Sequence, residues 1–138
     1  MKTTRKNAAS QQALSLPQRL QALEIERHAR RLAAIKCMHT RLVLLDAFMP
    51  AIERAGVCMS LGDVTDWGGK HLCLSAGLLD RPSAAKLVNV LLANGMEVEE
   101  MKDWPGEFGH STFYLKKGRL RVSVMVDTRA MHLLELAK

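Results

Sequence analysis

The stretch that decides the fold is residues 35–52, IKCMHTRLVLLDAFMPAI. Apolar residues recur in it at alternating steps of three and four, which places them along one face of an α-helix. These residues are Ile35, Met38, Leu42, Leu45, Met49 and Ile52. Cys37, Val43, Leu44 and Phe48 lie off this face and are also apolar. The pattern therefore predicts a helix that is buried on several sides.

The same helix is expected to begin well upstream of the apolar stretch. Ser15 can cap a helix, and Gln18 stands three residues later, as in a capping box. Pro50 lacks a backbone N–H and should kink or end the helix before it. The sequence thus predicts one long helical stretch from Leu16 to about Ile52, with its packed part starting near Leu32.

Basic residues dominate the middle of this helix. From residue 27 to residue 41 there are five of them and no acid: Arg27, Arg30, Arg31, Lys36 and Arg41. At about 100° per residue, the four arginines fall within one sector of about 100°. Guanidinium groups on a rigid helix suit phosphate oxygens or carboxylates, so this face is the first candidate for a nucleic-acid contact. The alternative is a solvated face, partly neutralised upstream by the i,i+4 pairs Glu24–His28 and Glu26–Arg30.

Short strands and one further helix are predicted downstream. Alternating apolar residues favour strands over residues 57–61, 70–74, 96–101, 112–115 and 120–126, and helical spacing favours a helix over 84–94. The first two strands are expected to form a hairpin, and so are the last two, with a turn at residues 116–119. A short helix is expected from residue 127 or 128 to Leu136. This order, α-β-β-α-β-β-β-α, predicts an α+β fold: a long N-terminal helix and a small antiparallel sheet with helices packed on one face.

Two parts of the chain differ in how much they can bury. Residues 1–14 are mostly polar, carry Lys2, Arg5 and Lys6, and are expected to form a flexible basic arm. Residues 15–138 are expected to form a single α+β domain with a projecting N-terminal helix. Hydrophobic residues make up 48% of the chain and charged residues 25%, so a packed core is expected.

The net charge of +6 is unevenly distributed along the chain. Residues 1–41 carry +7, residues 42–100 carry −4 and residues 101–138 carry +3. A basic block attracts polyanions at long range. A second basic cluster lies at and beside a predicted hairpin turn and consists of Lys116, Lys117, Arg119 and Arg121. A basic β-ribbon can grip a nucleic-acid backbone, although lysines at a hairpin tip also serve to discourage edge pairing.

Acidic residues accompany both tryptophans. Trp104 follows Glu99, Glu100 and Asp103, and Trp67 follows Asp66. Tryptophan is a common anchor in protein interfaces, so Trp67, Glu99, Glu100, Asp103 and Trp104 form an alternative site for a basic protein partner. If both loops lie at one end of the sheet, they form a single acidic, aromatic rim. The other interpretation is that Trp104 folds back over the core.

The sequence offers little for catalysis or metal binding. No short catalytic or nucleotide-binding motif is present, and His110 beside Ser111 is no evidence of proximity in space. His71 and Cys73 share a strand face, but a tetrahedral site needs more ligands. We expect no metal, no cofactor and no enzymatic activity. The sequence leaves open whether Cys58 lies close to Cys73.

No N-terminal signal sequence or membrane-spanning run is evident, so we expect a cytoplasmic protein that does not enter membranes. In size and layout the chain resembles the small accessory proteins of phages and mobile elements, some of which inhibit host nucleases. That resemblance includes no shared residue pattern and assigns no site.

The sequence therefore favours a small non-enzymatic binding or regulatory protein that contacts nucleic acid or a nucleoprotein complex through its basic helix and arm. The alternative is a protein-interaction module or inhibitor. Such a protein would form a homodimer through its long helix or bind a host protein through its acidic tryptophan loops. Leu16, Leu20 and Leu23 favour this alternative because they keep helical spacing outside the expected core.

Overall fold

The computed structural model describes residues 13–74, 81–106 and 109–135. The chain divides into two units, Met1–Cys37 and Met38–Lys138. Lys2, Arg5 and Lys6 of the predicted basic arm lie outside the described residues.

The first described helix is α2, Leu16–Asp46. It begins at the predicted capping box: the Ser15 N–H donates to Gln18 Oε1 at 3.0 Å, and the Gln18 N–H donates to Ser15 Oγ at 3.4 Å. These two bonds satisfy backbone donors that a helix start leaves unpaired. The helix ends at Asp46, before the proline, and Pro50 lies in the first turn of the short helix α3, Met49–Arg54. The predicted interruption before Pro50 is therefore confirmed.

Burial along these two helices starts later than the sequence pattern indicates. Met38, Leu45 and Ile52 are buried, but Ile35 at the start of the apolar face is 38% exposed. Leu32 is exposed as well, so the packed core begins at Met38 and not near Leu32. The prediction that the helix is buried on several sides is also wrong for α2, because Cys37, Val43 and Leu44 are exposed. Of the off-face residues only Phe48, just beyond the end of α2, is buried.

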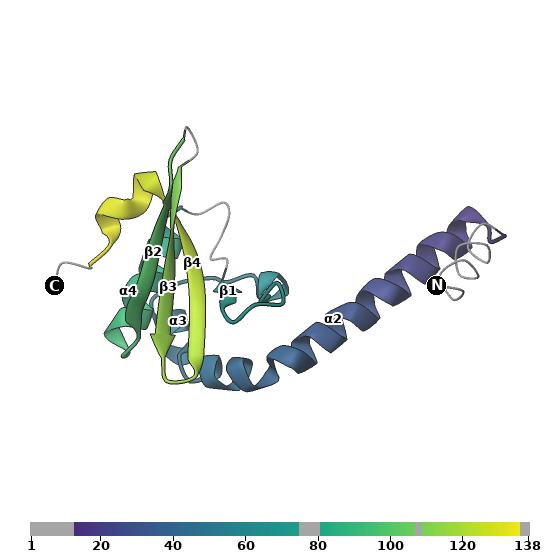
Figure 1. Ribbon diagram of the computed structural model, residues 1–138, viewed down its shortest axis with the longest axis horizontal. Coiled ribbons are helices and arrows are strands. Elements are labelled where there is room, and N and C mark those ends of the chain that lie inside the picture. The colour runs from purple at the N-terminus through teal and green to yellow at the C-terminus, as the bar shows by residue number, and fades with distance from the viewer. Residues whose placement is uncertain (1–12, 75–80, 107–108, 136–138) are drawn as a thin grey trace. The chain divides into compact units, whose positions relative to one another are not determined.

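The sheet has four strands in the order β1-β4-β3-β2. The strands are β1 Leu72–Leu74, β2 Glu97–Trp104, β3 His110–Lys117 and β4 Leu120–Asp127. The predicted β3–β4 hairpin is confirmed, and β2 pairs antiparallel with β3. Strand β1 pairs parallel with β4, so the sheet is mixed rather than wholly antiparallel. In Figure 1, β2, β3 and β4 lie in front of α3 and of α4, Arg81–Ala93.

The strand predicted over residues 57–61 is absent. The segment is irregular and leads into a 3₁₀ turn, Leu61–Asp63, and the nearest ladder contact is an isolated bridge between Thr65 and Cys73. Val57 is nevertheless buried, so its apolar character reflects packing and not strand pairing. The predicted first hairpin is therefore wrong. Cys58 is exposed in this segment, whereas Cys73 pairs in register with Ser123 of β4, and both thiols are free.

The helix α4 ends where it does because of Gly95. Gly95 adopts φ +103°, a conformation that residues with a Cβ rarely take. The following Met96 N–H donates back to the Leu91 carbonyl at 3.0 Å, which closes the last turn. The predicted stop at Gly95 is confirmed. The predicted C-terminal helix is a 3₁₀ helix, Thr128–Leu133, and its expected last residue, Leu136, lies outside the described residues.

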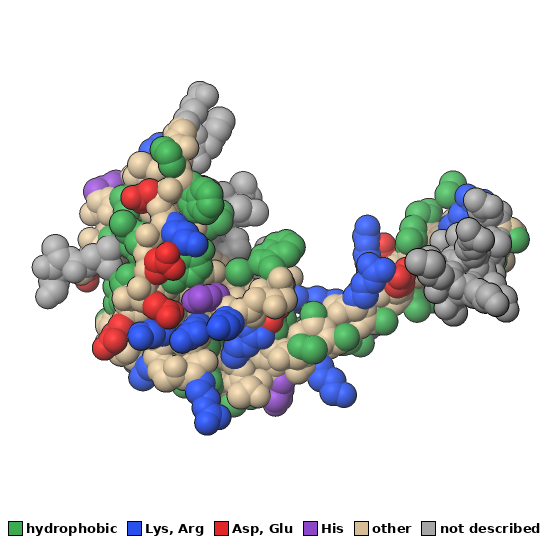
Figure 2. All heavy atoms as spheres, in the orientation of Figure 1, with side chains coloured by type: hydrophobic (Ala, Val, Ile, Leu, Met, Phe, Trp, Pro, Cys, Tyr) green, Lys and Arg blue, Asp and Glu red, His purple; other side chains and the backbone are tan. Residues whose placement is uncertain are grey.

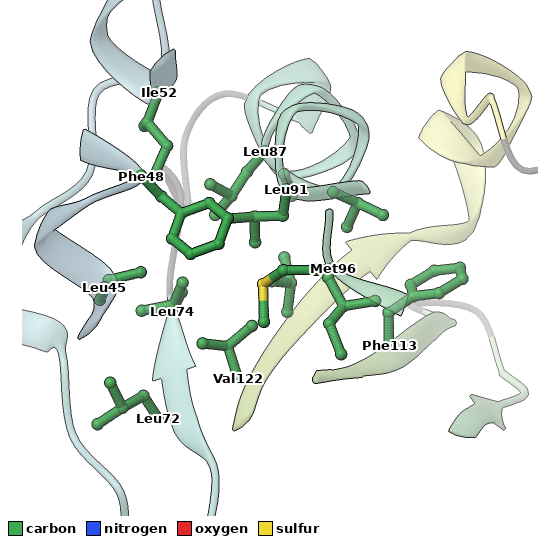
Figure 3. Close-up of a cluster of buried hydrophobic side chains, with 14 of the residues drawn as sticks. Leu45, Phe48, Ile52, Leu72, Leu74, Leu87, Leu91, Met96, Phe113 and Val122 are labelled. Atoms are coloured by element: carbon green, nitrogen blue, oxygen red, sulfur yellow. The ribbon is translucent and has the colours of Figure 1, made fainter. Parts of the chain in front are cut away.

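The core of the second unit lies between one face of the sheet and the helices α3 and α4. Figure 3 shows Phe48 and Ile52 from the α3 region facing Leu87 and Leu91 of α4, with Leu72, Leu74 and Val122 from the strands below. Phe113 of β3 and Met96 complete the same cluster. This packing turns one face of the sheet toward the helices and leaves the opposite face for polar side chains.

We expect Phe113→Ala to lower the free energy of unfolding by about 3–5 kcal/mol, because the ring is fully buried and its loss leaves a cavity. Met125→Ala on the exposed face of β4 is the matched control and should change it by less than about 0.5 kcal/mol. Chemical denaturation measures both. Equal effects of the two changes would contradict this assignment of the core face.

Candidate nucleic-acid interface

The helical arginines of the first unit already have partners of their own. Arg27 Nη1 lies 3.1 Å from Glu24 Oε1, and Arg30 forms an ion pair with Glu26. The Glu26–Arg30 pair was predicted from the sequence, whereas Glu24 pairs with Arg27 and not with His28. The side chains of Arg27 and Arg30 remain 78% and 74% exposed. Ion pairs this exposed contribute little stability and exchange readily for another anion.

The remaining cations of this helical segment differ in exposure and in direction. Arg31 is partly buried. Lys36 is exposed, but it stands nine residues from Arg27, about 180° around the helix, and so lies on the opposite side. Together with Arg27 and Arg30 they give residues 24–36 four cations against two carboxylates, a net charge of +2. This segment is therefore basic but moderate in charge, and its three guanidinium groups lie within one sector of the helix.

Arg41 does not belong to this exposed face. Its guanidinium pairs with the Asp66 carboxylate and also donates from Nη1 to the Gly69 carbonyl at 3.1 Å. Both side chains of the pair are mostly buried, at 20% and 15% exposed. Arg41 thus fastens the loop before β1 to the end of α2. Its guanidinium is thus engaged within the fold, unlike those of Arg27 and Arg30, and we leave it out of the candidate contact surface.

Lys117 of the β3–β4 hairpin is exposed but has partners within the fold. Its Nζ donates to the Asn94 carbonyl at 3.1 Å, just past the end of α4, and lies 5.3 Å from the centre of the Phe48 ring. A cation at a helix C-terminus is stabilised by the exposed carbonyls there. A Cβ on Gly95 would come within 3.0 Å of this Nζ, so the glycine leaves room for the lysine. Lys117 is therefore a structural residue rather than a free basic contact.

Lys116 and Arg121, which pair in register, lie on the face of the sheet turned away from the core, and Arg119 lies in the turn between β3 and β4. Arg121 lies 3.7 Å from Glu99, a long and half-exposed ion pair, while Lys116 and Arg119 are exposed. Figure 2 shows Lys and Arg side chains gathered near the turn between β3 and β4, with acidic side chains farther along the same face. Of the predicted ribbon, Lys116 and Arg119 are the most accessible to a polyanion.

The acidic residues of β2 are partly engaged as well. Glu99 lies near both Arg121 and His71, at 3.7 Å and 3.5 Å, and Asp103 accepts a hydrogen bond from Ser111 Oγ. Trp104 is half-exposed and stacks on the His110 ring with 6.2 Å between ring centroids. It does not fold back into the core, as one interpretation of the sequence had it. Glu100 is exposed.

Trp67 is the most exposed large apolar side chain among the described residues, at 84%. Its backbone has φ +50°, which is unusual for a residue with a side chain. A tight turn holds it there: the Gly68 N–H donates to Asp66 Oδ1 at 2.8 Å, and the Trp67 N–H donates to Thr65 Oγ1 at 3.3 Å. Because Arg41 holds Asp66, this turn presents the indole from a fixed base.

The two tryptophans do not form one rim. Trp104 ends β2 at one edge of the sheet, and Trp67 precedes β1 at the other edge, with β3 and β4 between them. The acidic, aromatic surface considered from the sequence therefore separates into two small sites. Of the two, the Trp67 loop has the more exposed indole and the firmer support.

Comparisons with protein-family models, with curated proteins and with solved structures find no match for this chain. Among the residues that the structure describes, no three or more His, Cys, Asp or Glu side chains are grouped so that they could hold a metal ion. Within the same residues, no helix combines the length and the apolar character that crossing a bilayer requires.

The Arg41–Asp66 pair predicts a measurable titration. The Arg41 guanidinium, and then the Gly68 N–H, lower the pKa of Asp66 below its ordinary 3.8. In Arg41→Gln, NMR titration of the Asp66 carboxyl should show this pKa moving back toward 3.8. Because the folded-state pKa is lowered, the stability from this pair is complete above about pH 4 and is lost as the pH falls through the folded-state pKa.

The difference in unfolding free energy between wild type and Arg41→Gln should therefore shrink as the pH is lowered below about 4. Lys70→Gln is the control, since it removes an exposed cation from the same loop. An Asp66 pKa that stays equally low in Arg41→Gln would contradict this description of the loop.

Proposed function

We propose that this chain is a non-enzymatic binding protein that contacts nucleic acid or a nucleoprotein complex. The contact surface is the basic face of α2 formed by Arg27, Arg30 and Arg31. The exposed hairpin residues Lys116 and Arg119 form a secondary contact. Binding proceeds through phosphates, with little reading of base edges, because guanidinium groups match phosphate oxygens in geometry and charge.

The observation that carries the proposal is the exposure of the Arg27 and Arg30 guanidinium groups on one helical face. Their carboxylate partners are neighbours on the same helix, three or four residues away. A phosphate can replace such a partner at little cost, because exposed ion pairs are weak and screened by salt. Arg41 and Lys117 differ, since each holds two segments of the fold together.

Removing three charges from this face tests the proposal. The variant Arg27→Gln/Arg30→Gln/Arg31→Gln should bind short duplex DNA, duplex RNA or single-stranded DNA more weakly than wild type. The slope of log affinity against log salt concentration should also become smaller by about 2–3, because each phosphate contact contributes about 0.9 to it. Fluorescence anisotropy over a salt series measures both quantities.

The matched control is Arg54→Gln/Lys86→Gln/Lys102→Gln, which lowers the net charge by the same amount at exposed positions elsewhere. It should leave the salt slope nearly unchanged. A wild-type affinity that does not respond to salt would contradict the proposal, and so would equal losses in the two triple variants.

A second candidate function is that of a protein-interaction module, and the Trp67 loop favours it. An indole that is 84% exposed has no stabilising role in the core, and its positive φ is held by the Asp66 turn. Unusual backbone conformations of this kind cluster at functional sites, and exposed tryptophans are frequent anchors in interfaces. The partner would then be a host protein with a pocket for an aromatic side chain.

Affinity capture from the native host's lysate separates the two candidates. If nucleic acid bridges the captured proteins, nuclease treatment and the triple arginine variant should each abolish capture, and Trp67→Ala should not. If the Trp67 loop binds a protein, Trp67→Ala should lose it in nuclease-treated lysate, while Trp104→Ala at the other sheet edge should retain it. If the triple arginine variant, Trp67→Ala and Trp104→Ala all still captured the same proteins after nuclease treatment, neither the basic face of α2 nor the Trp67 loop would be the binding surface.

A further inference from the structure

The face of α2 opposite Arg27 carries a second pattern that the proposed nucleic-acid contact does not use. Residues spaced alternately by four and three run down this face: Gln18, Ala22, Ile25, Ala29, Leu32 and Lys36. This is the spacing of a coiled-coil seam. Ile25 is 71% exposed and Leu32 54% exposed, although both are large and apolar. Large apolar side chains exposed in register along a helix mark a contact with another helix.

We propose that this seam pairs α2 with α2 of a second copy of the chain, in antiparallel orientation. The order of small and large residues makes the seam complementary to itself. When Ala22 faces Leu32 of the second copy, Ile25 faces Ala29 of the second copy, and the two-fold axis repeats both layers. Each central layer then joins a large side chain to a small one, so the helices can approach closely without leaving cavities.

A parallel pair would be less favourable for two physical reasons. In register it stacks Ala22 on Ala22 and Ala29 on Ala29 of the second copy, which leaves space, and it places Lys36 beside Lys36. The antiparallel register instead brings Gln18 level with Lys36 of the second copy. The antiparallel arrangement also opposes the two helix macrodipoles.

The charges beside the seam favour the same orientation. In the antiparallel register Glu26 lies near the two-fold axis, on the same flank of the pair as Arg30 of the second copy. In a parallel pair the two-fold axis would place Glu26 and Arg30 of the second copy on opposite flanks, where they could not meet. Opposite charges on the flanks set the orientation of paired helices.

The seam is short, and this sets the expected strength of the dimer. Residues 18–36 form about five helical turns, which bury an area at the low end of specific protein interfaces. We therefore expect a dimer that dissociates on dilution. Pairing does not require nucleic acid, and it leaves Arg27 on the outer side of each helix, so it stands independently of the proposed function.

Sedimentation of the full chain over a wide concentration range tests the dimer. Wild type should approach the mass of two chains as concentration rises, and Leu32→Glu should remain a monomer. Leu20→Glu is the matched control, because Leu20 is also exposed but lies on the opposite face of the same helix, and it should still dimerise. A monomeric wild type would overturn the proposal, as would a dimer that Leu20→Glu disrupts and Leu32→Glu does not.

Disulfide trapping tests the orientation. In a background in which Cys37, Cys58 and Cys73 are replaced by serine, a mixture of Ala22→Cys and Leu32→Cys chains should form a cross-linked heterodimer. Neither variant alone should cross-link, because equivalent positions would be about 15 Å apart along the pair. Cross-linking of each variant with itself would show a parallel pair and overturn the proposed orientation. The absence of any cross-link in the mixture would overturn the register.

Discussion

The structure depends on one constraint, the point along α2 at which apolar side chains find a core. From Met38 onward the face that includes Leu45 is buried in the second unit together with Phe48 and Ile52. Upstream of Met38, the large apolar residues of the same helix, such as Ile25 and Leu32, are exposed. An isolated helix is only marginally stable in water, because tertiary packing of an apolar face supplies most of the stability of helices in proteins. The exposed part of α2 is therefore the part of the chain with most to gain from a partner.

Charge is used in two distinct ways along the chain. Arg41 and Lys117 each connect segments distant in sequence, one the loop before β1 and the other the end of α4. Arg27 and Arg30 pair only with neighbours on their own helix and stay exposed. Cations of the first kind stabilise the fold, and those of the second kind remain accessible to an anion. The net charge of +6 therefore overstates the basic surface that can reach a polyanion.

Features set by neighbouring residues could be predicted from the sequence, and features set by distant ones could not. The capping box at Ser15, the stop at Gly95 and the β3–β4 hairpin each depend on a few adjacent residues, and each is confirmed. The parallel pairing of β1 with β4 joins segments about fifty residues apart, and no local pattern specifies it. The same holds for the candidate site. The sector of arginines could be predicted from the sequence. The ion pair between Arg41 and Asp66 could not, because those two residues meet only through the fold.

The most direct test of this account is backbone hydrogen exchange along α2, followed residue by residue at low protein concentration. Amides from Met38 to Asp46 should exchange only on global unfolding, since their helix face is packed in the core. Amides between Leu20 and Ile35 should exchange much faster, through local opening, and should slow when short DNA is added or the protein concentration is raised. Uniform slow exchange from Leu20 to Asp46 in the dilute protein alone would contradict the account, because the first part of the helix would then need no partner.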